Sequence, residues 1–351
     1  MSKIRILTIS ILIYTVTLFP WERMLFPNLY YGLQEESWSQ KQVEVFFPMG
    51  SYVKDEVALE QVEDKLTYEM LLSMQAKDEE RLSEDLEEVK EEEMKVNAEI
   101  SMEKLSNFQY LLSTYYTVDS TTTIGPDQLN ASEMLSKDMT LQNKSDGPKI
   151  LIFHTHSQEA FVDSVAGDAG TSIVGMGKYL AEKLNELGIE TLHHDGVYDY
   201  VNGKLDRSKA YELSEIGVKE ILNQYPSIEV VIDLHRDGVK ETTHLVTEVD
   251  GKQVAKIMYF NGLSRTKANG DISYLYNPYI QDNLAFSFQM QLATEARYPG
   301  LARRIYLKGY RYSLHMMPKS LLIEAGAQTN TVAEMKNAMD LLANVLADVL
   351  L

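Results

Sequence analysis

Three runs of almost uninterrupted apolar residues mark the C-terminal part of the chain, at 150–153, 230–234 and 321–323. A strand without alternation between apolar and polar residues is buried on both faces, as in the centre of a parallel sheet. Stretches in which apolar residues recur at helical spacing separate these runs. This order predicts an α/β domain whose sheet is mostly parallel and is flanked by helices.

The first predicted helix of this domain follows the run 150–153 and ends at Gly188, a residue suited to the left-handed cap position. One face of this helix is apolar and carries Ile173, Met176, Leu180, Leu184 and Leu187. A strand over 189–192 and a helix over 208–223 are expected next, and another helix over 282–296.

Asp250-Gly251 is the strongest short hairpin signal in the sequence, because both residue types tolerate the left-handed conformation of a type I′ turn. The turn is expected to join strands over 242–249 and 252–260. The last helix opens with a capping box formed by Thr331 and Glu334.

Residues 1–24 have the pattern of a membrane anchor. Lys3 and Arg5 precede an apolar run over 6–21, and no small-residue cleavage site follows it. The run is roughly 16 residues, which is short for a full span, so a core element of a soluble domain is the alternative. On the positive-inside rule, an anchor leaves the N-terminus in the cytoplasm. It places the rest of this single-pass cell-membrane protein outside.

Residues 25–116 are expected to form an acidic helical or coiled-coil spacer, because 54–112 contains mainly Glu, Lys, Leu and Met without Pro or Gly. The most acidic part, 78–93, is more typical of a solvated helix than of a tight zipper. Residues 117–148 are rich in Ser, Thr, Asn, Asp and Gly and are expected to be a linker. The catalytic domain then covers 149–351.

The charge and the lack of cysteine exclude several classes of function. The 351-residue chain has a formal net charge of −19 at pH 7, which would repel nucleic acid. It has no cysteine, so disulfides, thiolate nucleophiles and cysteine-based zinc sites are excluded. His, Asp and Glu are left as the metal ligands.

Ionisable residues follow each of the three apolar runs. His156 and Glu159 follow the first, His235 the second and Glu324 the third. Because ligands bind at the carboxyl ends of the strands in open α/β sheets, these side chains are expected to share one site. Two imidazoles and one carboxylate with an open fourth position are typical of hydrolytic zinc sites. Glu324 suits the catalytic carboxylate, and the following Ala325-Gly326 is expected to let substrate approach the backbone.

Other residues compete with or support this set. His154 points to the same face as His156 if the strand continues, whereas His156 is favoured as the ligand if the strand ends at 153. Asp163 and Asp168 are rivals of Glu159. Further histidines are expected to be solvated or structural: His193, His194 and His244.

Residues around the second histidine and before the last strand are expected to support the site. Asp233 is expected to orient the ring of His235. Arg236 is either a substrate clamp or a partner of Asp233 or Asp237. His315 either lines the site or packs in the fold.

Four strings resemble the stage II sporulation protein P family of endospore-forming bacteria. They are ILIFHTHSQEAF (150–161), YPSIEVVIDLHRDG (225–238), YPGLARRIYLKGYRYSLH (298–315) and LLIEAGAQTNTVAEM (321–335). The resemblance covers about 149–351 and extends to the N-terminal anchor. The sequence departs from the family pattern at Ser313-Leu314, where an Asn-Gln is usual, and at Tyr279, near a position where a Trp is common.

The resemblance implies a fold similar to zinc N-acetylmuramoyl-L-alanine amidases and hydrolysis of the bond between the muramic acid lactyl group and the first stem-peptide alanine. It places His156 and His235 on zinc-ligand positions, Glu159 on the acidic position of the motif and Glu324 on the catalytic glutamate. It also implies work in forespore engulfment beside stage II sporulation proteins D and M. Asn283 and His315 are candidates either for contact with substrate or for support of the residues that hold the metal.

The sequence therefore predicts a membrane-anchored zinc amidase that removes stem peptides from peptidoglycan during sporulation. Two alternatives stay open: a zinc endopeptidase that cuts peptide cross-links, and a non-catalytic wall-binding scaffold. Nucleic acid is not an expected partner.

Overall fold

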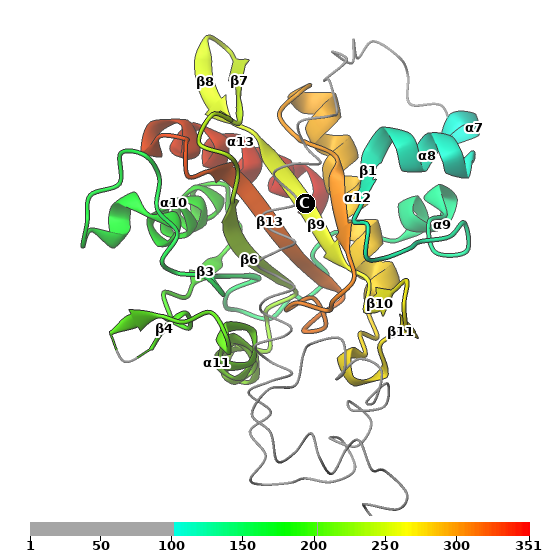
Figure 1. The fold of residues 1–351 in the computed structure, drawn as a ribbon, viewed down its shortest axis with the longest axis horizontal. Helices are drawn as coiled ribbons and strands as arrows, with labels where there is room; N and C mark the ends of the chain where they lie inside the picture. The colour runs from blue at the N-terminus through cyan, green and yellow to red at the C-terminus, as the bar shows by residue number, and fades with distance from the viewer. Residues whose placement is uncertain (1–101, 202) are drawn as a thin grey trace, which may run out of the picture. The chain divides into compact units, whose positions relative to one another are not determined.

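The computed structural model describes residues 102–201 and 203–351 (Figure 1). The predicted anchor and most of the predicted acidic spacer lie outside the described residues. Within the described ranges, none of the helices has the length and apolar character needed to cross a membrane.

A seven-stranded sheet with strand order β1-β12-β9-β13-β6-β2-β3 forms the centre of the described part. Its strands are β1 (Tyr116–Val118), β2 (Ile150–Phe153), β3 (Thr191–His193), β6 (Val230–Asp237), β9 (Ile257–Gly262), β12 (Ile305–Lys308) and β13 (Lys319–Ala327). Only the pairing of β9 with β13 is antiparallel among neighbouring strands of this sheet. The prediction of a mostly parallel sheet in an α/β fold is therefore confirmed.

Three helices, α10 (Ile173–Glu186), α12 (Ile280–Arg297) and α13 (Val332–Leu350), cover one face of the sheet (Figure 1). Leu234 and Ile323 belong to the large apolar core on this face. Helix α11 (Ala210–Gln224) packs on the opposite face, against β2 and β6.

Because side chains alternate along a strand, Asp233, His235, Leu322 and Glu324 point away from the large core. The part of this face over β13, β9 and β12 is where a site can form, since α11 packs over the β2 side.

The remaining elements are short. The helices are α7 (Met102–Leu105), α8 (Phe108–Tyr115), α9 (Ala131–Ser136) and the 3-10 turns η1 (Ala169–Thr171) and η2 (Ser273–Leu275). The strands are β4 (Tyr200–Val201), β5 (Lys204–Leu205), β7 (Val246–Val249), β8 (Lys252–Ala255), β10 (Arg265–Thr266) and β11 (Gly270–Asp271), which form three two-stranded sheets.

The local signals of the sequence are present in the structure. Asp250 and Gly251 adopt φ values of 52° and 75° and join β7 to β8. Thr331 and Glu334 form the predicted capping box of α13. The prediction of one strand over 252–260 is wrong, because the chain leaves the hairpin after Ala255 and enters the main sheet as β9. Strands far away in sequence, β13 and β12, hold β9 there.

The prediction of a linker over 117–148 is wrong. Residues 116–118 pair with β12 as the edge strand of the main sheet, although 116 was expected to end the spacer. Leu129, Met134 and Met139 are buried in the large core, and Gln289 of α12 donates to the backbone carbonyl of Met134. The polar composition concealed a few apolar residues that pack on the domain, so the segment belongs to it.

Candidate functional site

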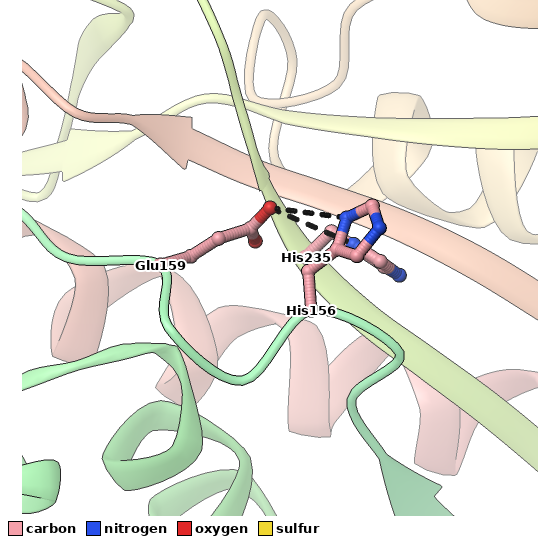
Figure 2. A group of neighbouring side chains, drawn as sticks. All are labelled: His156, Glu159 and His235. Atoms are coloured by element: carbon pink, nitrogen blue, oxygen red, sulfur yellow. Dashed lines mark ion pairs between the residues drawn. The ribbon is translucent and has the colours of Figure 1, made fainter. Parts of the chain in front are cut away.

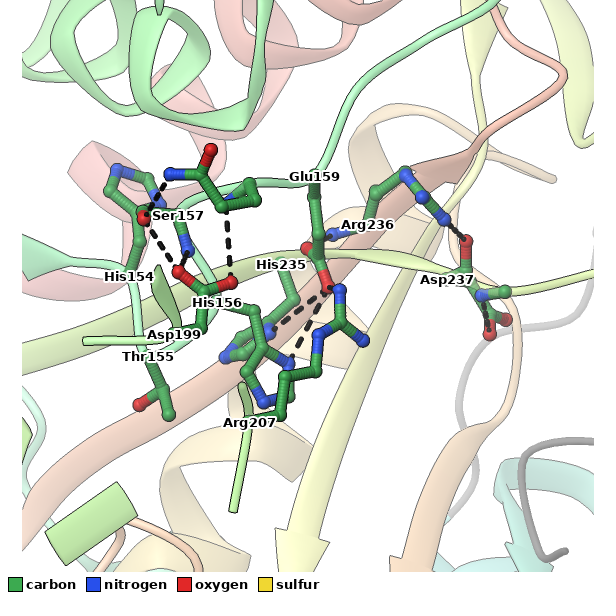
Figure 3. Close-up of polar contacts among 12 residues, drawn as sticks. His154, Thr155, His156, Ser157, Glu159, Asp199, Arg207, His235, Arg236 and Asp237 are labelled. Atoms are coloured by element: carbon green, nitrogen blue, oxygen red, sulfur yellow. Dashed lines mark hydrogen bonds and ion pairs between the residues drawn. The ribbon is translucent and has the colours of Figure 1, made fainter. Parts of the chain in front are cut away.

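His156 lies in the loop that follows β2, and two carboxylates fix this loop. Thr155 donates through its backbone N–H and its hydroxyl to Asp233, at 2.9 and 2.7 Å. Ser157 donates in the same two ways to Asp199, at 3.1 and 2.7 Å (Figure 3). Since both neighbours of His156 are tied down, the position of its buried imidazole is set before any ligand binds.

Glu159 brings a buried carboxylate against both imidazoles (Figure 2). Its Oε1 atom lies 3.5 Å from Nδ1 of His156 and 3.8 Å from Nδ1 of His235. Its Oε2 atom accepts the backbone N–H of Arg236 at 2.8 Å. Burial raises the pKa of Glu159, but the two histidines outweigh it and hold the pKa well below its usual range. The carboxylate is therefore ionised at neutral pH.

Asp233 orients His235 from the side opposite Glu159. Nε2 of His235 lies 2.8 Å from Oδ1 of Asp233, so Nδ1 is the ring nitrogen that points to Glu159. Burial lowers the pKa of His235, yet the charges of Asp233 and Glu159 outweigh it and raise the pKa well above its usual value. The expectation that Asp233 would position this ring agrees with the structure.

The donor atoms of His156, Glu159 and His235 all lie within 4.8 Å of one another. A tetrahedral zinc ion with bonds of about 2.0–2.1 Å holds its ligand atoms about 3.3–3.4 Å apart. The separations of 3.5 and 3.8 Å between the carboxylate oxygen and the two ring nitrogens are close to this value. The two buried carboxylates beside His235, those of Glu159 and Asp233, also suit a divalent cation. The residues therefore fit zinc.

Glu324 lies beside this group without belonging to it. It is the Cα partner of His235 across the parallel pair of β13 and β6, and it lines the same cleft. Both strands are longer than predicted, so His235 and Glu324 stand inside strands and not after them. Gly326 (φ 57°) does not serve substrate approach as expected, because a Cβ there would meet Met335 and Asn330 of this chain.

A cleft lies over this face of the sheet. Its lining joins the metal group to an aromatic and cationic surface: His156, Glu159, Arg207, Tyr211, His235, Arg236, Asp237, Gly238, Phe260, Tyr306, Lys308, Tyr312, Leu322 and Glu324. The arrangement provides three candidate metal donors and a carboxylate next to them in one cleft.

The model of the family Stage II sporulation protein P matches residues 34–347. This chain belongs to the stage II sporulation protein P family. The resemblance seen in the four strings is thereby confirmed.

The family member from Bacillus subtilis (strain 168) named Stage II sporulation protein P is 22% identical over 236 residues, which are 63% of this chain and 56% of that protein. The chain thus matches about half the length of this curated relative.

Solved amidases have a weaker likeness to this chain. An N-acetylmuramoyl-L-alanine amidase of Nostoc punctiforme is 16% identical, with 58% of this chain and 96% of that chain covered and a TM-score of 0.33. The CwlD amidase from Clostridioides difficile, in complex with the GerS lipoprotein, is 15% identical, with 57% and 94% covered and a TM-score of 0.35. Likeness at this level is too weak to assign an activity.

Of the competing ligands, the structure brings His156 and Glu159 into the group and places the others elsewhere. The strand ends at Phe153, and the buried His154 turns toward Leu234 O (2.7 Å) and His193 Nε2 (3.0 Å). Burial and the neighbouring His193 lower the pKa of His154 to about 3. Asp163 caps α13 by accepting the Val332 N–H. Asp168 caps η1.

Two of the candidates for substrate contact, Asn283 and His315, make contacts that stabilise the fold. Asn283 is buried on α12 and donates to the backbone carbonyls of Met317 and Pro318, so it fixes the turn before β13. His315 lies 3.2 Å from Glu215 of α11 and does not line the cleft. Neither side chain is among the residues that line the cleft, and for His315 the contact with Glu215 favours the packing alternative.

Arg236 lines the cleft, as one of its two interpretations required. The other interpretation also has support, because Arg236 donates to Asp237, although not to a carboxylate: the Asp237 carboxylate pairs with Arg303 at 2.6 Å, and Asp233 is engaged by His235 and Thr155. The guanidinium contacts only the main-chain oxygen of Asp237 among described residues, at 3.0 Å.

The remaining histidines have partners of their own. His193 lies in β3 and not in a turn, beside His154. Nε2 of His194 lies 2.6 Å from the Tyr198 hydroxyl, and His244 is half exposed and pairs with Glu334. The structural or solvated roles expected for them agree with these contacts.

Residues that no sequence pattern indicated also line the cleft. Arg207 follows β5 and places Nη2 3.5 Å from Oε1 of Glu159. Tyr211 of α11 packs edge-on against His156, with ring centroids 5.6 Å apart. Lys308 ends β12 and is buried in the cleft wall. A single arginine or tyrosine carries no spacing signal, so only the folded chain shows these positions.

Proposed function

We propose that this chain is a zinc-dependent peptidoglycan hydrolase that acts as an N-acetylmuramoyl-L-alanine amidase. The observation that carries the proposal is the convergence of three buried metal donors, His156, Glu159 and His235, with the carboxylate of Glu324 in one cleft. Membership in a sporulation family supports a role in the cell wall of the sporulating cell.

Each polar residue of the site has a part in the proposed hydrolysis. The ion would be held by His156, Glu159 and His235. Asp233 fixes the orientation of the His235 ring. Zinc supplies Lewis acidity and makes water a better nucleophile at neutral pH. Glu324 takes a proton from the attacking water and returns it to the leaving amine of the stem-peptide alanine.

The guanidinium of Arg236 supports this reading of the cleft. No carboxylate among the described residues lies within ion-pair distance of it, since its acidic neighbours are already paired. It is therefore available to donate to the carbonyl oxygen of the amide that is cut.

Digestion of purified peptidoglycan by the full chain tests the proposal. Zinc-dependent release of peptides with a free N-terminal alanine, identified by mass spectrometry, is the expected result. Products cut at the peptide cross-links would replace the amidase with an endopeptidase that uses the same site. Zinc binding at one ion per chain without any cleavage would leave a wall-binding scaffold as the better description.

We also propose that the chain is anchored in the cell membrane through residues 1–24 with the hydrolase outside the cytoplasm, beside stage II sporulation proteins D and M. The apolar run over 6–21 after Lys3 and Arg5 supports the anchor. Protease added to intact protoplasts should degrade the hydrolase domain, and full protection would contradict this orientation.

A further inference from the structure

Lys308 is a buried cation in the wall of the cleft. The residue is 6% exposed and lines the cavity. In residues 102–201 and 203–351, its ammonium makes no hydrogen bond and no ion pair. Burial raises the pKa of Asp119, but hydrogen bonds from Thr121 and the Tyr306 hydroxyl, and then the charge of Lys308, outweigh it and lower the pKa. That carboxylate already accepts both hydrogen bonds.

Removing an ammonium from water is costly unless a charged partner replaces the water. A lysine in a protein wall usually extends its head to solvent or to an acid. Lys308 lines the cleft, so a ligand bound there can contact its side chain. An anion bound in the cleft would supply the missing partner.

The sheet register places Lys308 at the far end of the cleft from the metal group. Glu324 is paired with Met258 on β9, and Gly262, four residues further along β9, is paired with Lys308. Four residues along a strand and two strand spacings put the Cα atoms of Glu324 and Lys308 roughly 16 Å apart.

Glu324 and Lys308 both line the cleft, so their own side chains occupy part of this span. The distance from the reacting bond to the ammonium is then on the order of 10 Å, which an extended peptide covers with about three residues.

An apolar floor connects the two ends of the cleft. Leu322, Phe260 and Tyr306 lie side by side on β13, β9 and β12, with Leu322 paired to Phe260 and Phe260 paired to Tyr306. Tyr312 closes the floor edge-on to Phe260, with ring centroids 4.8 Å apart. Apolar contact along the length and one cation at the end match a short chain that carries an acid.

We propose that this arm of the cleft is a subsite for an acidic peptide, in which Lys308 pairs with a carboxylate on the second or third residue beyond the bond that is cut. The inference rests on the proposed function, because it assigns the stem-peptide side of the same substrate. It identifies Lys308 as a specificity-determining residue that takes no part in the chemical step.

Two synthetic muramoyl tripeptides test the subsite with the full chain. They differ only in one group on the second residue, a free carboxylate in one and a carboxamide in the other. The carboxylate form should have a KM about 10- to 100-fold lower, the range of a charged hydrogen bond, with a similar kcat. Lys308→Met should raise the KM of the carboxylate form to that of the carboxamide, and Lys308→Arg should restore most of the difference.

Lys252→Met is the matched control, because it removes the same charge from the exposed hairpin strand β8. It should keep the preference for the carboxylate. Thermal unfolding of Lys308→Met is measured beside the kinetics, because the variant also removes a positive charge that acts on the buried Asp119. If it fails to fold, Lys308 is a structural residue, and Lys308→Gln then measures the preference.

Calorimetry with the two free tripeptides separates this inference from the proposed function. Tighter binding of the carboxylate tripeptide that depends on Lys308, in a chain that cuts neither substrate, would sustain the subsite and reject the hydrolase. Cleavage of both substrates with equal KM, or a preference that survives Lys308→Met, would overturn the subsite and leave the hydrolase intact.

Discussion

His235 and Glu324 stand directly opposite each other on adjacent parallel strands, β6 and β13. Side chains at paired positions of a sheet point to the same face. One metal donor and the proposed base are therefore fixed by backbone hydrogen bonds of the central sheet and not by a loop. Their spacing is insensitive to changes at the rim of the cleft, which is what a site that positions water requires.

Glu324→Gln should abolish hydrolysis and leave the metal in place. The amide cannot accept the proton of the attacking water, so kcat should fall by about 10²- to 10⁴-fold. Zinc content, measured by atomic absorption, should stay at that of the wild type because Glu324 is outside the donor group. The exposed Glu182→Gln is the control and should be fully active. Full activity of Glu324→Gln would sink the mechanism.

His156→Ala and His154→Ala should separate a metal ligand from a buried structural histidine. Loss of His156 removes one of three donors, so zinc should dissociate during dialysis. Loss of His154 opens a cavity and removes the contact with Leu234 O, so stability should fall by about 1–3 kcal/mol while zinc is retained. Zinc lost from His154→Ala and kept by His156→Ala would reverse the assignment.

Glu215 should stabilise the fold at neutral pH and not in acid. His315 first, and then Lys219 and Arg311, outweigh burial and lower the pKa of Glu215 from 4.5 to about 2. A lowered folded-state pKa stabilises above the unfolded value, and this contribution is lost as the pH falls from about 4.5 to about 2. Because the side chain is partly exposed, solvent screening reduces its worth to about 1 kcal/mol.

Urea denaturation of Glu215→Gln checks this pH dependence. The variant should be less stable than the wild type at pH 7, and the difference should shrink steadily toward pH 2.5. The exposed Glu212→Gln on the same helix should show no such difference at either pH. A difference for Glu215→Gln that stays constant with pH would contradict the ion-pair account.

Tyr116→Ala should destabilise the α/β domain although it lies before the predicted linker. Its ring is buried, stacks on Phe288 with centroids 6.2 Å apart and starts the edge strand β1. Removal of a buried aromatic ring costs about 3–5 kcal/mol. Tyr110→Ala on α8, where the ring is 38% exposed, should cost far less in the same denaturation experiment. A loss of stability for Tyr116→Ala as small as that for Tyr110→Ala would mean that residues 116–118 are dispensable.

The sequence by itself determined the features that depend on neighbours in the chain. The buried strands β2, β6 and β13, the hairpin turn at Asp250-Gly251 and the capping box at Thr331 follow from local spacing and residue type. Three apolar runs that each precede an ionisable residue were enough to predict that His156, His235 and Glu324 share one site, because parallel strands bring their carboxyl ends to one edge.

The tertiary structure decided what depends on contacts between distant segments. It separated His156 from His154, since only the end of β2 fixes which ring faces Glu159. The polar segment after Tyr116 belongs to the domain because β1 pairs with β12 and a few apolar residues of the segment are buried in the core. The pairing of β12 with β9 places Lys308 in the cleft wall. Residue spacing in the sequence does not predict this register.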